Sequence, residues 1–184
     1  MRRSSAWRFW QPLKEERVIQ ASLKELVTTG QLGPIRLGTA RTLIAELLGE
    51  PDQYALNSRT RQRKRLPPKI WKYGDIELHF ADATDQVYLI FLERFTIPSA
   101  GSKLQLDPWI IQQSLTVDIL EQALEHNHIP VHRDRKPHDD PDTLRLQAGV
   151  GVEFVFTTTS MSERTSAGLI AVTYSDLTSN SAPE

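Results

Sequence analysis

The sequence predicts an α+β fold, a two-layer sandwich in which helices pack on an antiparallel sheet. Three stretches show the apolar spacing of amphipathic helices, and six others resemble strands, the clearest by alternating apolar and polar residues. A capped helix followed by hairpin strands occurs twice within the 184 residues. Two such helix-plus-meander units are expected to share one core, because a single unit cannot bury both its helix stripe and its sheet face.

Two helices are expected in the first part of the chain. Residues 14–29 carry apolar side chains close to helical spacing, and the segment ends at Gly30, whose freedom at positive φ suits a helix C-terminus. Residues 40–48 form the second helix, with Thr39 as its expected N-cap and Gly49 as its stop.

An antiparallel meander follows these helices. Residues 70–73 and 76–80 alternate apolar and polar side chains on either side of a turn at residues 74–75. Residues 87–95 supply a third strand after another turn.

The second part of the chain has a similar order. Residues 115–126 predict a helix with Thr116 as its N-cap, and residues 132–142 read as a polar loop. Three strand-like segments follow, at residues 143–147, 150–158 and 167–174.

An internal repeat relates the two parts. At a shift of 76 residues, the stretch 73–80 corresponds to 149–156, which puts Glu77 and Glu153 in the same position. The capped helices before them correspond as well. We therefore divide the chain into an aromatic and basic arm, two helix-plus-meander units and a disordered tail, at residues 1–13, 14–98, 99–177 and 178–184.

Composition narrows the class of protein. The chain has no cysteine and no apolar run long enough to cross a membrane, so we expect a cytoplasmic protein without disulfides or thiol chemistry. The net charge of −1 hides a basic first part, with 15 Lys and Arg against 7 Asp and Glu in residues 1–75, and an acidic remainder. Such segments can attract each other within one fold, pair between copies in a homo-oligomer, or face different partners.

Residues 35–39 and 47–51, together with the strand 73–80, resemble known families. The helix-capped pattern is similar to that of small lipoproteins of outer-membrane assembly, the SmpA/OmlA type, and to β-lactamase-inhibitor-protein-like domains. It also resembles bacterial immunity proteins. These families are non-catalytic, so the resemblance implies protein recognition across an open sheet face. The chain lacks the lipobox cysteine of the lipoproteins.

A partner-binding site is predicted around a basic run and two aromatic residues. Residues 59–65 hold five positive charges in seven residues, and Trp71 and Tyr73 follow on one strand face. This run is open to three interpretations: a solvated loop, a contact for an acidic protein, or a phosphate contact for nucleic acid. The predicted partner-binding residues are Arg61, Arg63, Lys64, Arg65, Trp71 and Tyr73.

Two further groups of polar residues are candidate sites. Four of the five histidines cluster between residues 126 and 138, where a solvated loop competes with a metal site, although the spacing fits no known zinc motif. Glu77 and Glu153 could divide acid and base roles, or keep an open sheet soluble.

No catalytic motif is present: the sequence contains no phosphate-binding loop, no dinucleotide-binding glycine motif and no Gly-x-Ser-x-Gly elbow. We therefore expect a non-enzymatic protein-binding domain of the immunity or inhibitor kind, without cofactor or metal. The alternatives are a nucleic-acid-associated accessory protein that uses residues 59–65, and a metal-dependent hydrolase that uses the histidine loop.

Overall fold

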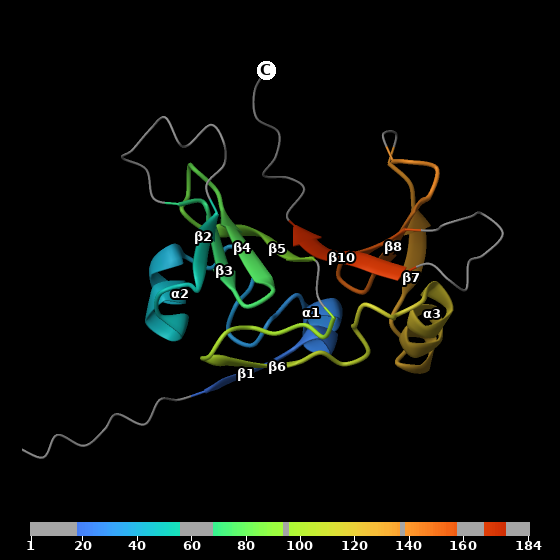
Figure 1. The fold of residues 1–184 in the computed structure, drawn as a ribbon, viewed down its shortest axis with the longest axis horizontal. Coiled ribbons are helices and arrows are strands. Elements are labelled where there is room, and N and C mark those ends of the chain that lie inside the picture. Colours follow the sequence, from blue (N-terminus) through green and yellow to red (C-terminus); the bar gives the residue numbers. More distant parts are fainter. Residues whose placement is uncertain (1–17, 56–67, 94–95, 137–138, 158–167, 176–184) are drawn as a thin grey trace, which may run out of the picture.

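The computed structural model describes residues 18–55, 68–93, 96–136, 139–157 and 168–175 (Figure 1). The predicted arm, the basic run 59–65 and the predicted tail lie outside these ranges. The strands are β1 Ile19–Ser22, β2 Gln53–Ala55, β3 Ile70–Tyr73, β4 Ile76–Phe80, β5 Val87–Glu93, β6 Leu104–Asp107, β7 Val131–Asp134, β8 Thr143–Ala148, β9 Val152–Thr157 and β10 Gly168–Ser175. The helices are α1 Leu23–Thr29, α2 Arg41–Leu48 and α3 Val117–His126.

The predicted two-layer α+β sandwich is wrong, because the described chain is mostly β. Eight strands form one antiparallel sheet in the order β2-β3-β4-β5-β10-β9-β8-β7, and β1 pairs with β6 in a separate parallel sheet. Eight strands span about 34 Å, whereas the 10 residues of α3 are only about 15 Å long. The three helices have 7, 8 and 10 residues, and at a width of about 10 Å they cover only roughly 380 Å² of a face of roughly 600 Å², so they do not form a layer over the whole sheet.

The sheet consists of two four-stranded meanders that meet at its centre. Strands β2 to β5 follow one another in space as in sequence, and so do β7 to β10, while β5 and β10 pair antiparallel. In Figure 1, α1, β1 and β6 lie below the middle of the sheet, α2 lies beside β2 and β3, and α3 lies beside β7. The central pair therefore joins segments about eighty residues apart in sequence.

One core occupies one side of the sheet. Every second residue of β3 and β4 is buried, and the helices and the β1–β6 pair contribute to the same cluster. Its largest fully buried side chains are Phe80, Phe154 and Phe156. Burying such rings contributes roughly 2 kcal/mol each, and alternation leaves the opposite side chains on a second, partly open face.

The N-terminal helix is shorter than predicted. Instead of one helix over residues 14–29, strand β1 precedes α1, and the hydroxyl of Ser22 accepts a hydrogen bond from the backbone N–H of Lys24 at 3.2 Å. Pairing of β1 with β6 outweighs the weak helical pattern around Val18, which is exposed. The expected end at Gly30 is confirmed, with φ of 77°.

The caps of the other helices were predicted in part. Thr116 caps α3 as expected, since its hydroxyl accepts from the backbone N–H of Ile119. Thr39 does not cap α2, because its hydroxyl donates to the carbonyl of Arg36 at 2.7 Å. Ala40 takes the N-cap position without a side-chain hydrogen bond.

The turn between β8 and β9 is held against α1. The backbone N–H of Val150 donates to the carbonyl of Val27 at 3.1 Å, and that of Gly149 donates to Pro130 at 2.9 Å. Gly149 has φ of 57° and lies directly against the Val27 carbonyl. This contact joins the end of the sheet to the helix beneath it.

Candidate functional site

A row of mainly polar and charged side chains lies on the open face of the eight-stranded sheet. The strand registers align one lateral row across every strand, from one edge to the other: Gln53, Lys72, Glu77, Phe91, Thr173, Glu153, Gln147 and His132. Because residues directly opposite each other in a sheet point to the same face, these side chains all lie on the face turned away from the core.

Glu153 is the centre of an ion cluster on one half of this face. Its carboxylate lies 2.7 Å from Nη1 of Arg145 and 2.9 Å from Nζ of Lys136, and its side chain is 13% exposed. Arg145 also binds Asp139, with Nη2 2.8 Å from the carboxylate. The hydrogen bonds from Arg145 and from the backbone N–H of Lys136 lower the pKa of Asp139 to about 2. Each of these charges therefore has an ionic partner within the structure.

Glu77 forms the matching cluster on the other half. Its carboxylate lies 3.3 Å from Nζ of Lys72 and 3.2 Å from Nε2 of His79. Burial lowers the pKa of His79, although the hydrogen bond with Glu77 opposes that shift. The imidazole is therefore neutral at neutral pH.

The burial of His79 gives a pH-dependent stability. Since the folded-state pKa lies below the usual 6.5, the unfolded chain binds the proton first, and stability falls as the pH drops below about 6.5. We expect the urea midpoint to decrease between neutral pH and about pH 5.5, and the decrease to be smaller in His79→Gln. An equal decrease in both proteins would show that His79 does not couple folding to pH.

An apolar and aromatic stripe separates the two clusters. Tyr88, Leu89 and Phe91 of β5 are each half-buried on this face. The His79 ring stands edge-on to Tyr88 and Phe91, with centroids 6.2 Å apart in both pairs. Such edge-to-face packing fixes the ring orientations and leaves part of each ring accessible.

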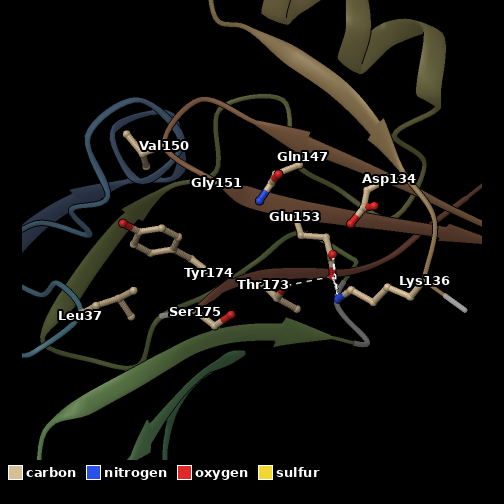
Figure 2. A pocket seen from close by; sticks show the side chains of 10 residues that line it. All are labelled: Leu37, Asp134, Lys136, Gln147, Val150, Gly151, Glu153, Thr173, Tyr174 and Ser175. Atoms are coloured by element: carbon tan, nitrogen blue, oxygen red, sulfur yellow. Dashed lines mark hydrogen bonds and ion pairs between the residues drawn. The ribbon is translucent and has the colours of Figure 1, made fainter. Parts of the chain in front are cut away.

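A pocket of about 500 Å³ lies beside Glu153, at the C-terminal end of β10. Figure 2 shows Lys136 reaching Glu153 at one side and the ring of Tyr174 between Leu37 and Val150 at the other. The remaining lining residues are Asp134, Gln147, Gly151, Thr173 and Ser175. One side of the pocket thus carries carboxylates, hydroxyls and an amide, and the other side is apolar.

The predicted aromatic contact residues lie in the core. Trp71 and Tyr73 are 8% and 4% exposed, and Trp71 packs edge-on against Tyr54 and Phe80. Alternation correctly put both residues on one face of β3, but that face is turned inward, so their expected presentation to a partner is corrected. Arg61, Arg63, Lys64 and Arg65 fall outside the described residues.

The histidine-rich segment is not a loop throughout, because its first residues form β7. His132 shares a hydrogen bond with the amide oxygen of Gln147 across the β7–β8 pair, and His126 ends α3. Within the described ranges, which omit His138, no three His, Asp or Glu side chains gather as metal ligands would.

The two equivalent glutamates do not form a catalytic pair. Glu77 and Glu153 are separated by β5 and β10, and three strand spacings amount to about 14 Å. Glu77 is paired with Lys72, and Glu153 is paired with Arg145 and Lys136. Their low exposure differs from the solvated charges that the sequence suggested.

Sequence reasoning missed Tyr88 and Phe91. Both lie in the strand predicted over residues 87–95, and the signal was that β5 carries apolar residues at nearly every position. Continuous apolar runs are typical of central strands with both faces partly buried.

No protein-family model, curated protein or solved structure matches this chain. Among the described helices, none has the length and apolar character needed to cross a membrane.

Proposed function

We propose that this chain is a non-enzymatic protein-binding domain that holds its partner against the open face of the eight-stranded sheet. The single observation that carries the proposal is the half-buried stripe of Tyr88, Leu89 and Phe91, which lies between two ion clusters on the open face. Aromatic side chains surrounded by oriented charges are the typical composition of the energetic centre of an interface. An inhibitor or immunity role, in which the domain covers its partner's working surface, is one form of this function.

The size of the face supports this use. The eight strands have three to eight residues each and make a surface of about 34 Å by about 18 Å, or roughly 600 Å². One partner in a standard stable interface contributes about 800 Å². The largely buried ion pairs Lys72–Glu77 and Arg145–Glu153 hold their side chains in place, so little ordering of these residues is needed on binding.

Two further points belong to the same proposal. The absence of cysteine supports a cytoplasmic place of action. The nucleic-acid alternative depends on residues 59–65, which lie outside the described ranges, and no observation of the described face favours it.

Substitution on the stripe tests the proposal. We expect Tyr88→Ala and Phe91→Ala to reduce capture of a specific protein from lysate of the source cells by at least about tenfold, since each loses an aromatic anchor. The full-length chain is immobilised, captured proteins are identified by mass spectrometry, and thermal melting confirms that each variant is folded.

Leu43→Ala and Ile119→Ala are matched controls, because these apolar residues are 43% and 50% exposed on α2 and α3. Both controls should retain capture. Loss of capture in the controls, with retention in the two stripe variants, would place the interface on the helices and refute the proposal.

A further inference from the structure

We propose that the partner segment on this face is basic, and that the pocket beside Glu153 receives one of its arginine or lysine side chains. This inference rests on the proposed function and adds the chemistry of the partner.

Charge on the open face favours a basic partner. Among the described residues of this face and of the β7–β8 loop beside it, the cations are Lys72, Arg135, Lys136 and Arg145, and the carboxylates are Glu77, Glu93, Asp134, Asp139, Asp140, Asp142 and Glu153. Glu93 and Asp142 have further interactions of their own, and without these two residues five carboxylates face four cations, while burial lowers the pKa of His79. Complementary charge steers association and suppresses partners of the wrong sign.

One of these carboxylates lies at the pocket without an ion pair among the described residues. Asp134 is exposed at its rim and accepts a hydrogen bond from the backbone N–H of Arg135 at 2.8 Å. Within the described residues it forms no ion pair, whereas Glu153 in the same pocket has two cationic partners. A carboxylate with unused acceptor capacity therefore faces a space of about 500 Å³, which is within the usual range for ligand pockets.

The other walls suit the body of a long cationic side chain. Leu37, Val150 and Tyr174 form an apolar side that can pack against methylene groups, and the Tyr174 ring offers a face for a guanidinium (Figure 2). The hydroxyls of Thr173 and Ser175 supply further acceptors for its N–H donors.

Lys136 marks the place where a guest cation would lie. Its ammonium is 2.9 Å from Glu153, but its side chain is 48% exposed, so it can turn to solvent at little cost. Arg145 remains bound to Glu153 at 2.7 Å, and the carboxylate is never left without a partner during this exchange. A cation already resting at this position shows that the pocket accepts positive charge.

The test uses the full chain and three short peptides. The probes are acetyl-Gly-Arg-Thr-Arg-Gly-amide and its twins with glutamine or glutamate in place of both arginines. Titration of the ¹⁵N-labelled protein at low salt should give a Kd near about 1 mM for the arginine peptide, with shifts in the amides of Gly151, Thr173 and Ser175. The glutamine and glutamate peptides should cause no saturable shifts there.

Asp134→Asn keeps the shape of the side chain and removes its charge. We expect it to weaken the arginine peptide roughly tenfold, because it removes a charge-assisted hydrogen bond. Asp118→Asn, an exposed aspartate in the first turn of α3, is the control and should leave the Kd unchanged.

The outcomes separate this inference from the function on which it rests. Equal affinity for the arginine and glutamine peptides, or no effect of Asp134→Asn, would overturn the basic-partner assignment even if capture still depended on Tyr88 and Phe91. Saturable, Asp134-dependent binding of the arginine peptide, with lysate capture unaffected by the stripe variants, would support the pocket and refute the stripe as the anchor.

Discussion

Gly149→Ala is expected to destabilise the folded chain by about 4 kcal/mol and to abolish its soluble accumulation at physiological temperature. A Cβ atom at this position would lie 1.9 Å from the carbonyl oxygen of Val27. That oxygen is a backbone atom, and the position of a Cβ is set by the backbone of its own residue, so no side-chain rotation can separate the two atoms. The residue also has φ of 57°, which side-chain-bearing residues adopt at a cost of about 1–2 kcal/mol. Relieving the clash would break the hydrogen bond from Val150 to Val27.

Gly38→Ala separates the two causes. Gly38 has φ of 84°, and no atom lies within 4 Å of the position of its added Cβ. This control should lose only the conformational part, about 1 kcal/mol. Urea unfolding monitored by tryptophan fluorescence measures both variants. Similar losses in the two proteins would show that close approach to α1 contributes nothing.

Arg41→Ala should cost about 3 kcal/mol, the second largest effect expected in this protein. The side chain is 10% exposed, and its guanidinium lies 4.1 Å from the ring centroid of Phe80 and 5.2 Å from that of Trp71. Its Nε donates to Asp85 at 2.7 Å, and Nη1 donates to the carbonyl of Pro68. One residue of α2 thus joins the β4–β5 turn to the residues leading into β3.

Two variants identify the origin of that loss. Arg41→Lys keeps the charge but cannot stack on the rings or donate in two directions, so it should recover less than half of the stability. Arg133→Ala is the control, because Arg133 pairs with Glu121 on the surface and is 46% exposed. Its loss should stay below about 1 kcal/mol, and a loss equal to that of Arg41→Ala would contradict the role of burial. Urea midpoints compare the three proteins.

The local parts of the fold could be predicted because their signals are local. Gly30 and Thr116 were recognised from single residue types at helix ends, and the β3–β4–β5 meander from alternation. The missing strands have only three or four residues, and they are stabilised by distant partners. β6 of Leu104–Asp107 pairs with a segment 85 residues away, which no nearby pattern reveals.

The candidate site was predictable only in outline. The shift of 76 residues identified Glu77 and Glu153 as equivalent, and the structure aligns them in one row. The sequence could not show that Lys136 and Asp139, in the β7–β8 connection, would form ion pairs with Glu153 and Arg145. Alternation put Trp71 and Tyr73 on the same face, but only the assembled core determines which face is inside.

Because β5 pairs with β10, the sheet can close only after β10 has been synthesised. β10 follows both β5 and β9 in sequence but lies between them in the sheet. Until β10 has been synthesised, the facing edges of β5 and β9 have unpaired backbone hydrogen-bonding groups. Chains truncated before β10 would have two separate half-sheets with unpaired strand edges. Such edges are bound by chaperones and expose the chain to proteases.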